Sequence, residues 1–203
     1  MKKFDFDLNK IYGSQKLSIG VFCSSSEFLE PIYKESAYIL GELIAKNSYD
    51  LVHGGGKIGL MGILAKAVQL NGGKVIGILP ESLNIKGIVS EIDDEIIITK
   101  DMTDRKNEIR KRSSAFIVLP GGFGTMEEFF ETITLIQLQY INKPLVLINI
   151  NNYYDDLIKF IQTAVNNKFI PEKDLNLFYI TNNCYDAINF INNKLKNLRL
   201  WWV

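Results

Sequence analysis

The sequence predicts an α/β protein in which a doubly wound parallel sheet forms a single domain. Short, continuously apolar runs alternate with segments of helical period from residue 17 to residue 197. Such runs are typical of parallel strands that helices cover on both faces of the sheet. The 203 residues can bury a core without disulfides, and no repeat or low-complexity linker divides the chain. We therefore expect one domain.

Each element follows from its local pattern. Seven runs rich in Val, Ile, Leu and Phe predict strands over residues 17–23, 50–53, 74–79, 95–99, 115–119, 144–150 and 177–180. Helical spacing predicts helices over 31–46, 59–70, 104–113, 153–166 and 185–197, and a long helix from about Thr125 to Tyr140. The domain then covers 17–198. An extension of residues 1–16 precedes it, and an apolar tail at 199–203, with Trp201 and Trp202, follows it.

Composition excludes several classes of partner. Lys+Arg and Asp+Glu both number 23, so no net charge favours nucleic acid or an anionic membrane. No apolar run approaches the roughly 18 residues of a membrane span, and residues 1–10 lack the apolar core of a signal peptide. The two cysteines, Cys23 and Cys184, are too few for a disulfide framework or a zinc site. We expect a cytoplasmic protein in which Cys23 is a small buried residue.

Three loops lie where a doubly wound sheet binds ligands, beyond the carboxyl ends of its strands. They contain Ser24-Ser25-Ser26, Gly54-Gly55-Gly56 and Gly121-Gly122. The last is the most informative, because it joins the apolar run at 115–119 to the start of a helix. Glycines admit an anion close to the backbone amides, and a helix N-terminus adds about half a positive charge. Gly121, Gly122, Gly124 and Thr125 therefore predict a phosphate-binding loop.

Two carboxylates follow this loop, and they allow two interpretations. Glu127 and Glu128 stand in the predicted first turn, where chemistry on a phosphorylated ligand needs an acid or a base. Thr125-x-x-Glu128 is also the pattern of a capping box, in which Glu128 is purely structural. In the functional interpretation Glu128 lies about one sugar ring from the phosphate. There it can stabilise positive charge on a ribose or activate water.

The second glycine loop is ambiguous. Gly54, Gly56 and Gly59 satisfy the dinucleotide spacing G-x-G-x-x-G, which favours an NAD(P)-dependent oxidoreductase as one alternative. That fingerprint normally follows the first strand, whereas here it follows the second, and Glu81 is late for the acid that holds a ribose. Glycines required for a tight turn and close packing explain the loop equally well.

Basic residues mark a further helix start. Arg105 and Lys106 follow Met102-Thr103 in a predicted loop at a strand end, where a guanidinium can hold phosphate bidentately. Arg110-Lys111-Arg112, further along, is expected to be a solvated helix surface. His53 is the only histidine, which excludes histidine triads and His-rich metal sites. An enzyme built on this chain would work with carboxylate and arginine.

Two motifs together resemble the Lonely Guy family, whose members are cytokinin riboside 5'-monophosphate phosphoribohydrolases. They are Pro120-Gly121-Gly122-x-Gly124-Thr125-x-x-Glu128 and, upstream, Met102-x-x-Arg105-Lys106. Val21 to Ser26, Gly54 to Gly62, Gln137-Leu138, Lys143-Pro144 and Tyr153-Tyr154 are similar to other segments of the family. The resemblance implies a Rossmann-like fold, a homodimer with active sites near the subunit interface, and no cofactor or metal. The implied reaction splits an adenine nucleotide into free base and ribose 5-phosphate.

The resemblance also implies roles for individual residues. Arg105 and Glu128 correspond to the catalytic pair, and Gly121 to Thr125 correspond to the phosphate loop for an AMP-like substrate. Residues that the matched motifs place around the substrate are Lys106, Glu127, Thr134, Met102, Ser25, Gly55, Gly56 and Glu81. A nucleotide-binding or carrier protein without hydrolysis stays open as the alternative, because it would need the same loops.

Overall fold

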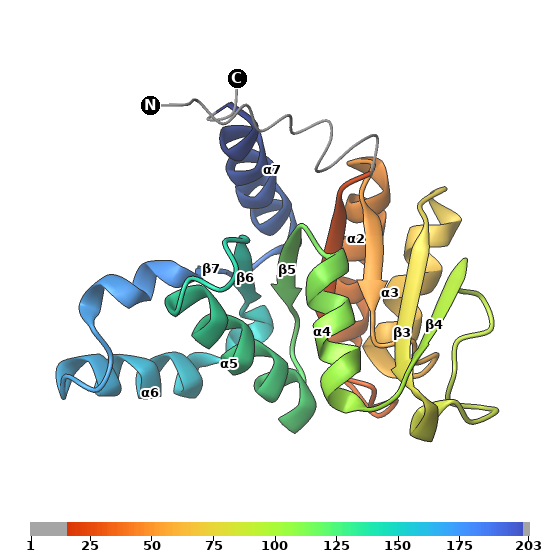
Figure 1. Cartoon of the computed structure of the whole chain (residues 1–203), viewed down its shortest axis with the longest axis horizontal. Coiled ribbons are helices and arrows are strands. Elements are labelled where there is room, and N and C mark those ends of the chain that lie inside the picture. Colours follow the sequence, from red (N-terminus) through yellow and green to blue (C-terminus); the bar gives the residue numbers. More distant parts are fainter. Residues whose placement is uncertain (1–15, 201–203) are drawn as a thin grey trace, which may run out of the picture.

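The structure is a computed structural model that describes residues 16–200 of the chain. Residues 1–15 of the expected extension, and Trp201 and Trp202 of the expected tail, lie outside the described residues. One sheet contains seven strands: β1 (Ser18–Phe22), β2 (Asp50–His53), β3 (Val75–Pro80), β4 (Glu95–Thr99), β5 (Ala115–Val118), β6 (Leu145–Ile148) and β7 (Tyr179–Thr181). Their order is β4-β3-β2-β1-β5-β6-β7, and every neighbouring pair is parallel (Figure 1). The predicted α/β fold class is confirmed.

Helices follow most strands. They are α2 (Pro31–Lys46), α3 (Gly59–Leu70), α4 (Met102–Arg112), α5 (Phe123–Gln137), α6 (Asp155–Asn166) and α7 (Cys184–Leu200), with short 3-10 turns η1 (Glu81–Leu83), η2 (Ile150–Asn152) and η3 (Glu172–Leu177). The predicted loop at Met102-Thr103 is wrong, because α4 already begins at Met102. The cause is Asp101, whose side chain accepts a hydrogen bond from the Asp104 amide at 2.9 Å and so caps the helix early.

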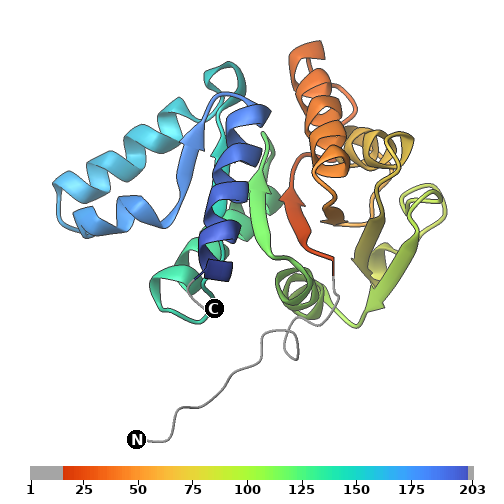
Figure 2. The ribbon, with the colours of Figure 1, turned by 90° about the horizontal axis from the view of Figure 1, so that it is seen from above.

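The sheet separates two apolar cores, as a doubly wound fold requires (Figure 2). Alternate residues of one strand point to opposite faces, so Ile117 of β5 joins one core and Phe116 joins the other. Buried residues of α2, α3 and α7 complete the first core, and residues of α4, α5 and α6 pack into the second. Within residues 16–200, no helix combines the length and apolar character needed to cross a membrane.

The strand order reverses between β1 and β5, and this reversal positions the site. The chain builds the sheet outward from β1 to β4 and then returns to place β5 on the other side of β1. The loops that follow β1 and β5 therefore lie side by side, and the Ser24 amide donates to the Pro120 carbonyl at 3.2 Å. This is the crevice in which doubly wound sheets bind ligands.

Candidate active site

A cavity of about 360 Å³ opens at the carboxyl ends of β1 and β5. The loop after β1, the glycine loop after β2 and the starts of α4 and α5 contribute its walls. Its lining residues are Val21, Phe22, Cys23, Ser24, Ser25, Ser26, Gly54, Met61, Met102, Arg105, Gly122, Phe123, Gly124, Thr125, Glu127 and Glu128. Most of the residues that the two motifs single out therefore meet in one place.

A buried ion pair lies in this cavity. The Arg105 Nη1 group contacts Glu128 Oε1 at 2.9 Å, and both residues are only 8% exposed. Arg105 Nε also donates to the Ile78 carbonyl at 3.1 Å, which fixes the guanidinium between β3 and α5. Burial raises the pKa of Glu128 above its ordinary value, while the positive charge of Arg105 opposes that rise. The pair holds a desolvated carboxylate at the cavity wall, a typical property of catalytic groups.

The start of α5 is open toward the cavity. Gly122 is the N-cap residue, and no side chain caps the helix. The capping-box interpretation of Thr125 and Glu128 is therefore wrong, and Glu128 bonds to Arg105 instead. Because α5 begins at Phe123, Glu127 and Glu128 stand in its second turn and not in the predicted first turn. The first amides of α5 are left for a ligand, and the helix dipole favours an anion there.

Lys106 lies just behind this wall in a network of ion pairs. Its ammonium contacts Glu127 and lies 3.0 Å from Glu131, which Arg110 also contacts at 2.8 Å. The expectation of a solvated surface at Arg110 is wrong, since this residue is only 9% exposed. The reason is that α4 packs beside α5, and the acids of α5 draw the basic face of α4 inward. Lys106 does not line the cavity.

Close packing accounts for the glycines of the second loop. A side chain at Gly54 would meet the Arg105 guanidinium at 2.1 Å, and one at Gly59 would meet the Ser25 backbone at 2.5 Å. Gly55 and Gly59 also have positive φ angles of 71° and 65°, which favour glycine. Gly56 forms a bridge to Val89 and does not line the cavity. These contacts favour the packing interpretation over the dinucleotide fingerprint.

His53 has a structural contact that the sequence did not suggest. It is fully buried, and its Nε2 lies 2.7 Å from Asp93, whose other oxygen accepts a hydrogen bond from Ser90. The Ser90 amide in turn donates to the Gly55 carbonyl at 2.8 Å. The contacts of His53, Asp93 and Ser90 thus connect the segment 84–94 to the glycine loop. Gly54 of this loop packs against Arg105. No local signal in the sequence pairs positions 40 residues apart.

Other predicted residues are placed elsewhere. Gly121 lies directly behind the cavity, with its carbonyl bonded to Tyr153. Glu81 is exposed in η1, and Thr134 is exposed on α5, where its hydroxyl bonds the carbonyl of Phe130 in its own helix. Neither lines the cavity of the described chain.

Cys23 and Met61 are among the lining residues that were not predicted as part of the site. Cys23 is buried as expected, but it also lines the cavity, and burial raises the pKa of its thiol. Met61 lies in the first turn of α3, and its sulfur is 3.1 Å from the position that a Cβ at Gly54 would take. Its place two residues after Gly59, close to the glycine loop, was the available signal for a site residue.

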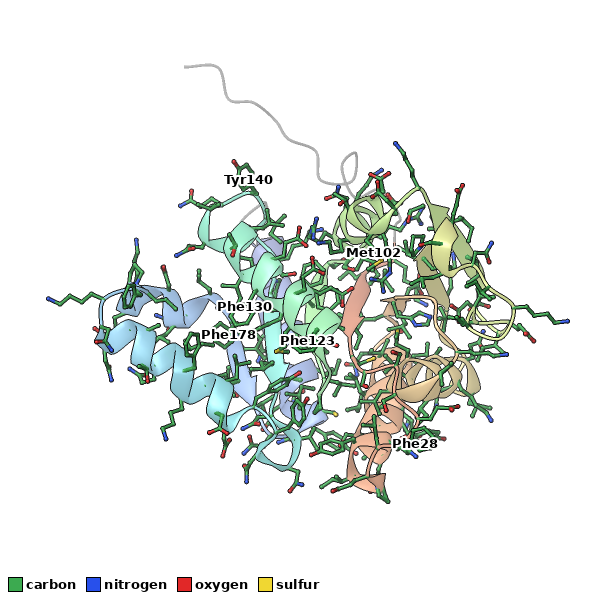
Figure 3. All side chains as sticks on the ribbon, turned by 90° about the horizontal axis from the view of Figure 1, so that it is seen from below. Phe28, Met102, Phe123, Phe130, Tyr140 and Phe178 are labelled. Atoms are coloured by element: carbon green, nitrogen blue, oxygen red, sulfur yellow. The ribbon has the colours of Figure 1, made fainter. Side chains whose placement is uncertain are left out.

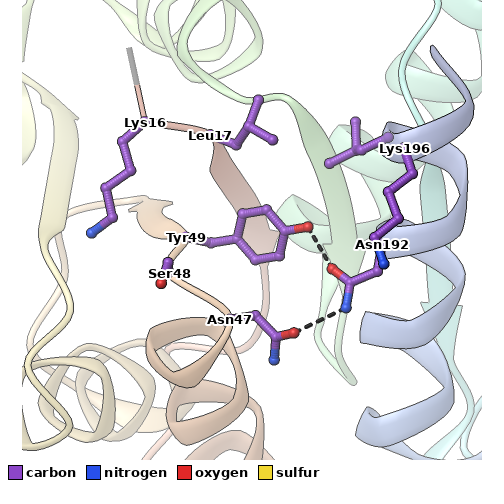
Figure 4. Close-up of a pocket in the computed structure, with 8 residues that line it drawn as sticks. Lys16, Leu17, Asn47, Ser48, Tyr49, Asn192 and Lys196 are labelled. Atoms are coloured by element: carbon purple, nitrogen blue, oxygen red, sulfur yellow. Dashed lines mark hydrogen bonds between the residues drawn. The ribbon is translucent and has the colours of Figure 1, made fainter. Parts of the chain in front are cut away.

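A second cavity, of about 440 Å³, lies at the opposite end of the sheet (Figure 4). Lys16, Leu17, Asn47, Ser48, Tyr49, Asn192, Leu195 and Lys196 line it. The Tyr49 hydroxyl donates to Asn192, whose amide donates to Asn47 at 2.9 Å. Although this cavity is larger, it lies at the amino ends of β1 and β2, away from the edge where parallel sheets bind ligands. We therefore place the site at the Arg105–Glu128 pair.

A protein-family model and several known proteins match this chain. A family model described as "possible lysine decarboxylase" matches residues 61–191. The chain is 43% identical over 152 residues to cytokinin riboside 5'-monophosphate phosphoribohydrolase LOG7 of Arabidopsis thaliana, covering 75% of this chain and 70% of that protein. It is 45% identical over 152 residues to LOG3 of the same plant, covering 75% and 71%. A probable enzyme of the same name from Oryza sativa subsp. japonica, LOGL9, is 41% identical over 168 residues, covering 83% and 74%.

Solved structures share the fold. A molybdenum cofactor binding protein from Rippkaea orientalis has a TM-score of 0.68 and 26% identity, covering 90% of this chain and 99% of that one. The molybdenum cofactor carrier protein of Chlamydomonas reinhardtii has a TM-score of 0.70 at 24% identity, covering 90% and 99%. The likeness to the second protein shows the fold alone.

Proposed function

This chain belongs to the Lonely Guy family of cytokinin riboside 5'-monophosphate phosphoribohydrolases, and we infer that it is an enzyme of that activity. It hydrolyses the N-glycosidic bond of adenosine 5'-monophosphates, with or without an N6 substituent, to free base and ribose 5-phosphate. The observation that carries this conclusion is the buried Arg105–Glu128 pair beside the open start of α5. Decarboxylation, the other description given to the family, needs a lysine that binds pyridoxal phosphate, and the described cavity lining contains no lysine.

We propose that the substrate phosphate binds at the start of α5. The amides of Gly122, Phe123, Gly124 and Thr125 belong to the N-cap and first turn, which have no partner within the helix. A side chain at Gly122 or Gly124 would meet nothing within 4 Å, so a ligand can approach both backbones. Binding the phosphate here contributes energy remote from the bond that breaks, and this energy positions the ribose.

The carboxylate then acts at the ribose. When the bond between C1' and the base nitrogen breaks, its electron pair leaves with the base and positive charge develops on the sugar. The Glu128 carboxylate stabilises that charge and accepts a proton from the water that adds to C1', and the departing base takes up a proton from solvent, so that the reaction is a hydrolysis overall. Arg105 lowers the pKa of Glu128 against the effect of burial, which favours the carboxylate, and its hydrogen bond fixes the orientation of that group. Ser25 and Met102 line the same cavity and contact the substrate beside these groups.

A chromatographic assay tests this function. AMP and isopentenyl-AMP are incubated with the protein in parallel, and free base and ribose 5-phosphate are measured, while calorimetry records nucleotide binding. Release of base from either substrate is expected, and the ratio of the two rates gives the preferred base. Tight binding of both with no product over hours would contradict hydrolysis. That result would favour a carrier, the second candidate, which the 26% identity to a cofactor-binding protein supports.

The pH dependence of the reaction follows from burial of Glu128. Because burial raises its pKa above the ordinary 4.5 and the reaction uses the carboxylate, kcat/KM rises with pH through that raised pKa. We expect the midpoint of the acid limb to lie above pH 4.5 for AMP. The affinity for ribose 5-phosphate over the same range corrects for ionisation of the phosphate itself, near pH 6 by its usual pKa of about 6. A corrected profile that stays flat down to pH 4.5 would contradict the assignment.

We also propose that the protein is a homodimer that forms through the exposed face of α5. Phe123 is 98% exposed and Phe130 is 40% exposed on this helix (Figure 3). Thr134 follows Phe130 by one turn of α5 and is exposed too, so we expect a second copy that covers Phe130 to cover Thr134 as well. Exposed aromatic side chains of this kind are typical of a protein interface.

Substitutions on this face test the dimer. Phe130→Ser is expected to weaken self-association by roughly 30-fold, because truncating a central aromatic side chain costs about 2 kcal/mol. Sedimentation velocity over a concentration series measures the dissociation constant. Phe169→Ser is the matched control, since Phe169 is 84% exposed but follows α6. A wild type that sediments as a monomer, or equal effects of the two substitutions, would contradict this interface.

The state of the two cysteines bears on the cellular compartment of the protein. Cys23 and Cys184 are both free and buried, and the two thiols form no disulfide in the described chain. Free thiols are typical of proteins in a reducing compartment. We propose a cytoplasmic location on this basis.

A further inference from the structure

Three consecutive carbonyl groups at the beginning of the phosphate loop, those of Leu119, Pro120 and Gly121, accept hydrogen bonds from other parts of the chain. Tyr154 Oη donates to the Leu119 carbonyl at 2.8 Å, and the Ser24 amide donates to the Pro120 carbonyl at 3.2 Å. Tyr153 Oη donates to the Gly121 carbonyl, also at 2.8 Å. The two tyrosines lie between η2 and α6, and neither lines the cavity. Burial raises the pKa of Tyr154, so its hydroxyl stays protonated as a donor.

The orientation of each carbonyl decides where the next amide points. In a planar trans peptide the C=O of one residue and the N–H of the next point in opposite directions, and the described chain has no cis peptide bond. The carbonyl of Leu119 is followed by Pro120, which has no N–H. The carbonyl of Gly121 is followed by the Gly122 amide, which therefore points away from Tyr153. Gly122 lines the cavity, so this is the amide that the tyrosine directs.

The peptide between Gly121 and Gly122 needs such a constraint. Gly121 itself is packed tightly, since a Cβ on it would meet Thr125 Oγ1 at 2.1 Å, whereas Gly122 has open space around it. Two successive glycines allow their shared peptide plane to flip at little steric cost. A flip would remove the Gly122 N–H from the phosphate and turn the Gly121 oxygen toward it. An anion would then face a partial negative charge.

We propose that Tyr153 is a positioning residue for the substrate phosphate, because its hydroxyl holds the Gly121–Gly122 peptide with the N–H directed at the anion. The inference rests on the proposed function, which places a phosphate at this loop. The ring of Tyr153 is fixed by edge contacts with Tyr33 at 6.0 Å and with Tyr154 at 4.8 Å between centroids. The hydroxyl acts through the peptide and does not contact the substrate.

Two matched substitutions test the inference. Tyr153→Phe removes only the hydroxyl, and we expect the dissociation constant for ribose 5-phosphate to rise roughly tenfold, with a similar fall in kcat/KM for AMP. The kcat/KM for adenosine, which lacks the phosphate, is expected to change less than about twofold. Tyr154→Phe makes the same chemical change beside a carbonyl that precedes proline. It is expected to lower the melting temperature, because Tyr154 is only 2% exposed, while ribose 5-phosphate affinity stays within about twofold.

The outcomes separate this inference from the proposed reaction. Calorimetry with ribose 5-phosphate reports on the loop even if no nucleotide is hydrolysed, so the inference holds when Tyr153→Phe alone loses affinity. Unchanged affinity in Tyr153→Phe would overturn it. Equal losses in both variants would also overturn it, since they would indicate a general loosening of the loop. A wild type that binds neither ribose 5-phosphate nor inorganic phosphate would contradict a phosphate site at the start of α5, and would overturn the inference as well.

Discussion

Glu128→Gln is expected to lower kcat/KM for AMP by about two to four orders of magnitude, the usual range for loss of a catalytic acid or base. An amide carries no negative charge to stabilise a ribosyl cation, and it cannot accept a proton from water. The fold is expected to persist, because Gln keeps the shape of Glu and its carbonyl can still accept the hydrogen bond from Arg105. Base release is measured by chromatography, and folding by the thermal transition.

Glu131→Gln is the control for this substitution. Glu131 lies one turn further along α5 and pairs with Lys106 and Arg110 instead of lining the cavity. Its loss is expected to change kcat/KM by less than about threefold, since Glu131 does not line the cavity and its partly exposed ion pairs contribute little to stability. Full turnover in Glu128→Gln would contradict the catalytic assignment.

Arg105→Ala is expected to have the second large effect, on both activity and stability. It leaves the Glu128 carboxylate buried without its cation, and breaking a buried pair in this way costs about 3–5 kcal/mol of unfolding free energy. Because Arg105 lowers the pKa of Glu128, its removal raises that pKa further. The fraction of carboxylate at neutral pH then falls, so kcat/KM is expected to fall by at least about a hundredfold. The acid limb of any residual activity moves to higher pH.

Arg110→Ala separates the two parts of that effect. Arg110 belongs to the same helix, is buried to a similar extent and also pairs with a glutamate of α5, at 2.8 Å. Its removal is expected to destabilise the protein through loss of a buried guanidinium, but by less than Arg105→Ala because the Glu131 side chain is 32% exposed, while kcat/KM stays within about tenfold. If both variants lost activity equally, the role of Arg105 would be structural.

Much of the fold could be predicted because the period of apolar residues along the chain is a local signal. The strand at Asp50–His53 and the helices at Pro31–Lys46 and Gly59–Leu70 have the predicted bounds. The helix start at Phe123 could not be predicted from Thr125, because no side chain marks it. Gly122 adopts the N-cap position and leaves the first amides open. A start without a cap is unfavourable for the helix alone, and it leaves room for a bound anion.

The sequence motifs identify residues of the site, but they do not give the contacts between them. Arg105 and Glu128 were recognisable as a pair, but their 2.9 Å contact depends on how α4 packs against α5. That packing also buries Arg110, which its local sequence marks as a surface residue. The hydrogen bond from Tyr153 to Gly121 joins residues 32 positions apart, and no pattern along the chain indicates it. Long-range contacts of this kind follow from the tertiary structure alone.

A crystal structure of Glu128→Gln with AMP would show where the nucleotide binds, because the inactive variant retains its substrate. We expect the phosphate within hydrogen-bond distance of the amides of Gly122 to Thr125, and the ribose C1' beside the side chain at position 128. A nucleotide bound with its phosphate at Lys16 and Lys196, at the opposite end of the sheet, would contradict this expectation. A phosphate at the start of α5 with the ribose turned away from Arg105 and residue 128 would support the phosphate site but contradict the catalytic role of Arg105 and Glu128.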